Sequence, residues 1–154
     1  METYKLYKVG GIIRDRLLGI PSKDIDYSFI FDNIDLNVTA DEYFIKMKNI
    51  LIEKGVTIYQ ERPDCFTIRG RLDLEDVDFV MGRRETYPHS DSRIPEVVIG
   101  NLYDELARRD FTMNAIAEDE DGNLIDPFNG QKDIQDKILR CPIDAQTSFN
   151  DDPL

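Results

Sequence analysis

The chain is poor in the residues and segments that several common functional classes need. Its two cysteines, Cys65 and Cys141, are too few for a disulfide framework. Its single histidine, His89, lies in a loop-like stretch and is expected to be exposed rather than a metal ligand. No basic segment followed by an apolar run opens the chain, and no apolar run is long enough to cross a bilayer. These absences predict a soluble, cytoplasmic protein without a membrane partner.

Basic residues are also scarce, because 19 lysines and arginines face 31 acidic residues and the net charge is -12. A protein that binds nucleic acid unaided usually carries a basic face that neutralises phosphates. The sequence shows no such face. Three explanations stay open: the partner is small, nucleic acid is held by something outside these residues, or bound metal offsets a local acidic cluster. Much of the excess acid is expected to be solvated surface.

What the chain does contain suits one globular domain with a single core, since 41% of its 154 residues are hydrophobic. Periodicity and turn residues predict strands and helices in alternation. The expected strands are 5–9, 24–31, 56–60, 65–69, 74–81 and 124–125. The expected helices are 12–18, 39–54, 102–108, 112–117 and 132–139, with a long loop at 82–100. The predicted fold class is α/β of an α+β-like kind, with a small, mixed, largely antiparallel sheet flanked by helices on one face.

Residues 9–26 carry the strongest chemical pattern. Gly10 and Gly11 follow an apolar strand and open a helix, so backbone amides and the helix N-terminus can approach an anion such as phosphate. Asp24 and Asp26 open the next strand and, being two residues apart, point to the same face. Acidic pairs recur in this chain, but this pair stands out because it opens an apolar strand just after the glycine turn.

Asp78 is the third notable carboxylate, because its neighbours Val77, Phe79 and Met81 are apolar and predict a buried strand. A lone carboxylate in such a position is costly unless it is paired or bound to metal. Three carboxylates that converge from two strands, Asp24, Asp26 and Asp78, would form the minimal cage for two Mg²⁺ ions.

The segment 108–114 leaves two interpretations open. In one, Arg108 and Arg109 complement a helix dipole at its C-terminus and a cap follows. In the other, an arginine reaches a triphosphate or ribose, and Asp110 and Asn114 hold it in place.

Taken together, the motifs resemble a known family. The resemblance rests on residues 9–19 with 24–26, then 78–87, 92–97, 105–115 and 125–130, in this order. It is to the head domain of bacterial-type CCA-adding enzymes and poly(A) polymerases, which are class II members of the DNA polymerase β-like nucleotidyltransferase superfamily. The resemblance covers almost the whole chain and implies the polymerase β-like nucleotidyltransferase fold.

The resemblance also implies an activity: transfer of a nucleotide from an NTP, ATP or CTP, to an RNA 3′ end, with release of pyrophosphate. The acceptor would be a tRNA that receives CCA, or an RNA that receives a poly(A)-type tail. The roles carried over are metal binding and catalysis for Asp24, Asp26 and Asp78. Nucleotide binding is carried over to Gly10, Gly11, Arg14, Arg109, Asp110 and Asn114. The loop 87–100 would be a mobile element near the site.

Residues 1–154 would then be a head domain alone. The neck, body and tail helices that select the base and hold tRNA in the family are expected to lie outside them. Two alternatives follow from this: a module that binds NTP and Mg²⁺ but needs a second protein for RNA, and a nucleotidyltransferase with an acceptor other than tRNA. The oligomeric state is left open.

Overall fold

The computed structural model describes residues 3–21, 25–86 and 96–142. Its elements are β1 (Tyr4–Val9), α1 (Gly11–Leu18), β2 (Ile25–Phe31), α2 (Ala40–Glu53), β3 (Thr57–Arg62), η1 (Pro63–Cys65), β4 (Thr67–Leu72), β5 (Glu75–Met81), β6 (Arg83–Thr86), β7 (Glu96–Ile99), α3 (Leu102–Ala107), η2 (Thr112–Asn114), β8 (Ala117–Glu118), β9 (Leu124–Ile125) and α4 (Gly130–Asp136).

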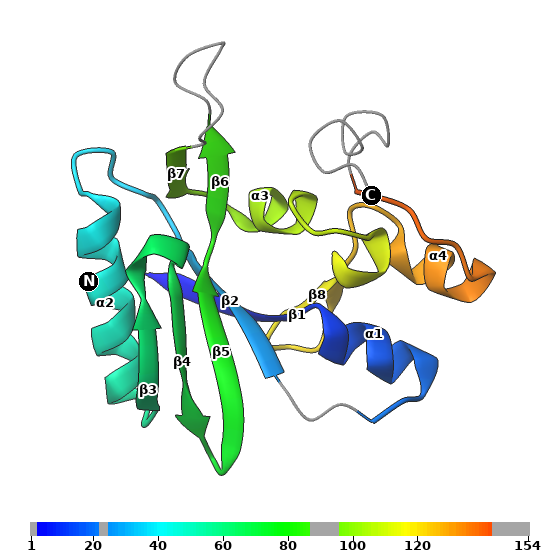
Figure 1. Ribbon diagram of the computed structural model, residues 1–154, viewed down its shortest axis with the longest axis horizontal. Helices are drawn as coiled ribbons and strands as arrows, with labels where there is room; N and C mark the ends of the chain where they lie inside the picture. The colour runs from blue at the N-terminus through cyan, green and yellow to red at the C-terminus, as the bar shows by residue number, and fades with distance from the viewer. Residues whose placement is uncertain (1–2, 22–24, 87–95, 143–154) are drawn as a thin grey trace.

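One seven-stranded sheet organises these elements, with strand order β3-β4-β5-β2-β1-β8-β9 (Figure 1). Neighbouring strands are antiparallel except β2 and β5, which run parallel because α2 and the β3–β4 hairpin connect them. The mixed, largely antiparallel α/β sheet predicted from the sequence is confirmed. In the described part of the chain, no helix is both long and apolar enough to cross a membrane.

The face of the sheet covered by α2 holds the main apolar core. Thr39 caps this helix by accepting a 3.2 Å hydrogen bond from the Glu42 amide, and Gly55 follows its end with a φ of 95°. These are the start and stop signals that the sequence predicts. The buried side chains of this face alternate along β2, β4 and β5 and along one stripe of α2. They include Phe29, Phe31, Tyr43, Met47, Leu51, Ile68, Val77, Phe79 and Met81.

The other face of the sheet is covered by α1, α3 and α4, on the opposite side from α2 in Figure 1. Val9 points to this face and packs with Leu106 of α3 and Ala117 of β8. Ile13 of α1 joins Ile116 and Ile134 in a third small cluster. Helices therefore cover both faces, and the prediction that they cover one face is wrong. The glycine turn begins α1, the helix that connects β1 to β2 on this face.

Three local predictions also need correction. The expected loop 82–100 contains a two-stranded sheet of β6 and β7, in which Arg83 pairs with Ile99. Residues 87–95, the rest of that expected loop, lie outside the described residues. The expected helix 112–117 is the short 3-10 turn η2 followed by β8, and α4 begins and ends earlier than the expected 132–139.

Candidate nucleotide site

The glycine turn between β1 and α1 lies at the centre of the candidate site. Gly10 has φ 74° and ψ -134°, a conformation strained for any residue with a Cβ. A Cβ built on Gly10 would lie 3.3 Å from Nη1 of Arg109 and 4.0 Å from Oδ2 of Asp26. The turn therefore brings a helix N-terminus, an arginine and a carboxylate to one point. The first amides of a helix have no partner within it, so they can serve an anion.

A second arginine flanks the same turn. Nη2 of Arg14 lies 3.2 Å from the place where a Gly11 Cβ would be. Its Nη1 donates a 2.9 Å hydrogen bond to Oδ1 of Asn114, and Nδ2 of Asn114 donates a 3.0 Å bond to Oδ1 of Asp110. Asp110 and Asn114 thus lie at the site, and they hold Arg14 rather than an arginine of their own segment. Nε of Arg14 also pairs with Oδ1 of Asp15 at 2.9 Å. Two guanidinium groups, each with a carboxylate partner, therefore flank one glycine turn.

Asp26 and Asp78 are neighbours across the parallel strands β2 and β5. They face each other in the register of the sheet, so their side chains point to the same face, away from α2. Nε of Arg69 on β4 lies 3.6 Å from Oδ1 of Asp78, whose side chain is 35% exposed. Asp78 is therefore partly solvated and paired, although its neighbours Val77 and Phe79 are buried. The sequence predicts that a carboxylate at this position needs a partner, and Arg69 is one.

Asp24, the remaining predicted carboxylate, lies outside the described residues. Within 3–21, 25–86 and 96–142, no three acidic, histidine or cysteine side chains come together as a metal site. The pair Asp26 and Asp78 nevertheless fits Mg²⁺ in donor chemistry, since carboxylate oxygens are its preferred protein ligands and both lie on one face of the sheet.

Arg109 is held by Glu105, a residue of the motif 105–115 to which the sequence assigns no role. Oε1 of Glu105, on α3, lies 3.5 Å from Nη2 of Arg109 and 3.4 Å from Nη1 of Arg108. Glu105 is 1% exposed. Burial raises the pKa of its carboxyl, and the nearby Arg109, Arg108 and Arg83 partly offset that rise. Among 31 acidic residues Glu105 looks like helix surface. The signal available was its spacing of three and four residues from the two arginines.

Buried polar atoms without hydrogen-bond partners gather near this cluster. Within the described residues they are Oγ of Ser28, Nε of Arg83, Oε2 of Glu105 and Nε of Arg109. α3 contacts both β2 and β6, the strands that carry the other members of the set. Such atoms are rare in folded proteins, and each needs an explanation. One explanation is that a polar ligand binds at this face and satisfies them.

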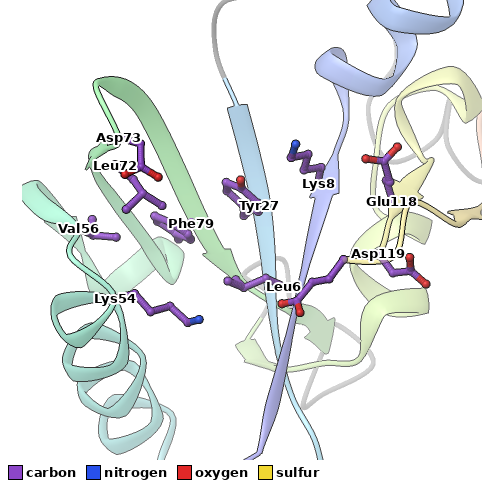
Figure 2. Close-up of a pocket in the computed structure, with 12 residues that line it drawn as sticks. Leu6, Lys8, Tyr27, Lys54, Val56, Leu72, Asp73, Phe79, Glu118 and Asp119 are labelled. Atoms are coloured by element: carbon purple, nitrogen blue, oxygen red, sulfur yellow. The ribbon is translucent and has the colours of Figure 1, made fainter.

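A hollow of about 460 Å³ lies elsewhere, on the α2 side of the sheet (Figure 2). Tyr27 and Phe79 stack in its floor with ring centroids 5.2 Å apart, and Lys8 and Lys54 reach toward it. Tyr27 neighbours Asp26 along β2, so strand alternation sends the two side chains to opposite faces. The glycine turn and the paired aspartates define the candidate site, and this hollow is separate from it.

A turn that presents amides and two guanidinium groups beside paired carboxylates is an arrangement for a metal-bound phosphate ester. Comparison with known families agrees with this class. The family model described as "Poly A polymerase head domain" matches residues 6–140. The chain belongs to this family, so the resemblance read from its motifs is confirmed.

Individual relatives point the same way. The chain is 34% identical over 153 residues to a CCA-adding enzyme of Geobacillus thermodenitrificans, covering 98% of this chain and 34% of the relative. It is 35% identical over 151 residues to the multifunctional CCA protein of Pseudomonas fluorescens, covering 97% of this chain and 32% of the relative. The chain therefore spans about a third of the length of these curated relatives.

Solved structures share the fold. The Bacillus stearothermophilus CCA-adding enzyme in complex with CTP superposes with a TM-score of 0.71 at 28% identity, over 97% of this chain and 32% of that one. A tRNA nucleotidyltransferase complexed with a primer tRNA and an incoming ATP analogue superposes with a TM-score of 0.69 at 30% identity, over 97% of this chain and 38% of that one.

Proposed function

We propose that this chain is a Mg²⁺-dependent nucleotidyltransferase head that adds a nucleotide from ATP or CTP to an RNA 3′ end, with tRNA as the acceptor. The observation that carries the proposal is the in-register pair Asp26 and Asp78 beside the Gly10 turn. Family membership and the relatives' complexes with CTP, an ATP analogue and primer tRNA support it. The unpaired Cys65 and Cys141 fit the cytoplasm as the compartment of this reaction.

In this proposal each group has a defined part. The amides of the Gly10–Gly11 turn, with Arg14 and Arg109, bind the triphosphate. The RNA 3′-hydroxyl attacks the α-phosphorus, a new O–P bond forms, and the bond to the β-phosphate oxygen breaks to release pyrophosphate. Asp78 accepts the hydroxyl proton. Mg²⁺ held by Asp26, Asp78 and Asp24 would supply charge stabilisation for the attacking and leaving oxygens.

The charge of the chain favours one alternative, a module that binds NTP and Mg²⁺ while a second component holds the RNA. The net charge is -12, and the arginines of the site gather at one glycine turn rather than along an extended surface. Unaided RNA binding normally needs a basic surface. The two functions differ in one measurable property: the affinity of the chain alone for tRNA.

The test combines labelled ATP or CTP, Mg²⁺, and tRNA that lacks its 3′ CCA. We expect wild-type protein to label the tRNA, and Asp26→Asn to lower the rate about a thousandfold, since metal-assisted charge stabilisation is worth several kcal/mol. Glu53→Gln is the matched control, because it removes one negative charge from the exposed end of α2, on the opposite face.

Three outcomes are informative. Equal rates for Asp26→Asn and wild type would refute the assignment of Asp26. NTP binding without labelling, followed by labelling when extract from the source cells is added, would support the binding module. Labelling of a protein or small molecule in place of tRNA, seen by mass spectrometry, would show a different acceptor.

A further inference from the structure

The strongest feature outside the proposed chemistry is the carboxylate of Glu105. Its side chain is 1% exposed, yet three guanidinium groups act on it: Arg83, Arg108 and Arg109. A single buried carboxylate among three cations leaves an excess of positive charge. An acidic residue used only for helix stability would instead lie on the solvated side of α3.

The geometry of Arg109 indicates what the Glu105 carboxylate does. Nη2 is taken by Glu105 at 3.5 Å, whereas Nη1 lies 3.3 Å from the place of a Gly10 Cβ. Arg109 is 20% exposed on its side chain, so it has little freedom to turn elsewhere. One end of the guanidinium is therefore anchored, and the other end faces the glycine turn.

The buried polar atoms without hydrogen-bond partners support the same interpretation. Nε of Arg109 and Oε2 of Glu105 are buried without partners among the described residues. A cluster built only for stability would satisfy them, since each such atom costs free energy. A cluster that keeps an arginine ready for an anion retains unmet hydrogen-bonding capacity until the anion arrives.

We infer that Glu105 is a positioning residue for the nucleotide: it holds Arg109 so that its Nη1 edge faces the Gly10–Gly11 turn, where the triphosphate binds. This inference rests on the proposed function, because the anion at the turn is the NTP. Glu105 itself does not touch the nucleotide. Glu105 also contacts Arg108 and accepts a hydrogen bond from the backbone of Arg83, which join it to α3 and β6. Its effect on the nucleotide passes through Arg109, and this property separates it from a residue that only stabilises α3.

The first experiment is a double-mutant cycle on the binding of Mg²⁺-ATP and Mg²⁺-CTP, measured by calorimetry. Glu105→Gln keeps the size of the side chain and removes the charge. We expect it to weaken NTP binding about tenfold, the loss expected for one charge-assisted contact. In an Arg109→Ala background the same change should alter binding less than twofold, because the residue through which it acts is gone.

Two further variants sharpen the cycle. Glu105→Asp keeps the charge with a shorter reach and should recover part of the affinity. Arg108→Ala removes the other arginine that contacts Oε1, and it should leave NTP binding within twofold of wild type. If Glu105→Gln acts equally in both backgrounds, or if Arg108→Ala weakens binding as much as Glu105→Gln does, the inference is wrong.

The second experiment needs no nucleotide. The guanidinium Nη–H signals of Arg109 in a ¹⁵N NMR spectrum, assigned with Arg109→Lys, report whether Glu105 holds this side chain, because Nη2 is the nitrogen that Glu105 contacts. We expect slow hydrogen exchange in wild type and Glu105→Asp, and rapid exchange in Glu105→Gln. The backbone amide spectrum should be the same in all three proteins, which shows that the fold is unchanged. Unchanged exchange in Glu105→Gln would overturn the inference. If wild type binds neither nucleotide while the NMR result holds, the proposed function fails and the positioning of Arg109 by Glu105 stands.

Discussion

The two faces of the central sheet share the same strands but differ in almost every other respect. On the α2 face, β2 and β5 contribute buried apolar side chains such as Phe29 and Phe79. On the opposite face, the residues between them are Asp26, Ser28 and Asp78, beside a glycine turn and a cluster of arginines. Strand alternation thus separates stability from chemistry within single strands. Substitutions one residue apart should therefore have effects of different kinds.

The largest effect on stability should come from Phe29→Ala. Phe29 is fully buried and stacks on Tyr4 with ring centroids 4.7 Å apart. Its truncation should lower the free energy of unfolding by about 3–5 kcal/mol, measured by urea denaturation. Ser28→Ala is the adjacent control, since the buried Oγ of Ser28 has no hydrogen-bond partner in the described structure. Its removal should cost less than about 1 kcal/mol or even stabilise the fold. Equal losses for the two variants would break the contrast between the faces.

The next largest effect should come from Gly10→Ala, which changes both the backbone and the site. The φ of 74° at Gly10 should cost about 1–3 kcal/mol of stability with any Cβ. The new Cβ would also press on Arg109 and should weaken NTP binding about tenfold.

A matched variant separates these two effects. Gly122 has φ 85°, and a Cβ added there would meet nothing within 4 Å, so Gly122→Ala carries the strain without a contact at the site. It should lower the melting temperature and leave NTP affinity within twofold of wild type. A loss of affinity in Gly122→Ala equal to that in Gly10→Ala would show that strain alone is responsible.

A smaller effect is expected for Asn114→Ala, which removes the hydrogen bond that Asn114 accepts from Arg14. One such bond contributes about 1 kcal/mol, so NTP affinity should fall about fivefold. Asn123→Ala removes a comparable side-chain bond, from Asn123 to Asp119, in the β8–β9 turn. Fluorescence titration with an ATP analogue should detect a change only in Asn114→Ala. A change in both variants would count against a specific role for the Arg14 network.

The smallest effect should be a pH dependence of stability that comes from Glu105. Burial raises the pKa of its carboxyl above the ordinary 4.5 in the folded protein. The folded state therefore holds this proton more tightly than the unfolded state does. The resulting contribution to stability is present below about pH 4.5 and is lost as pH rises through the folded-state pKa.

Urea denaturation between pH 4 and pH 7 checks this sign. The unfolding free energy of wild type relative to that of Glu105→Gln should fall as pH rises. The other carboxylates are common to both proteins, so their titration cancels in this difference. The charged groups that act on Glu105, namely Arg83, Arg108 and Arg109, are likewise common to both proteins. A difference that does not change with pH would mean that the burial of Glu105 leaves its protonation unaffected.

Sequence reasoning succeeds where neighbours along the chain decide the structure. Gly10 and Gly11 end a strand and open a helix by local conformation, and alternation through β2 assigns Asp26 to one face and Phe29 to the other. The capped helix α2 follows from its apolar stripe and from Thr39 and Gly55. These elements needed no information about distant partners.

The failures arise where distant segments decide the structure. β6 and β7 pair with each other across a proline- and serine-rich segment whose composition suggests a loop. Helix η2 stops after three residues because the chain enters β8, which pairs with β1. Glu105 reads as a solvated helix residue until packing buries it among arginines. Long-range packing overrides local pattern in all three cases.

The parallel pairing of β2 with β5 has a consequence for folding kinetics. The glycine turn and the β1–β2 pair form from segments adjacent in the chain, whereas Asp78 reaches Asp26 only after α2 and the β3–β4 hairpin have closed a long loop. Non-local pairings of this kind bear the larger entropic barrier and form slowly. During refolding the β1–β2 pair should therefore precede the carboxylate pair. Arg109 and Asn114, which reach the glycine turn from still later in the chain, should arrive no earlier than Asp78. Nucleotide binding and catalysis should therefore both return only after this crossover has closed.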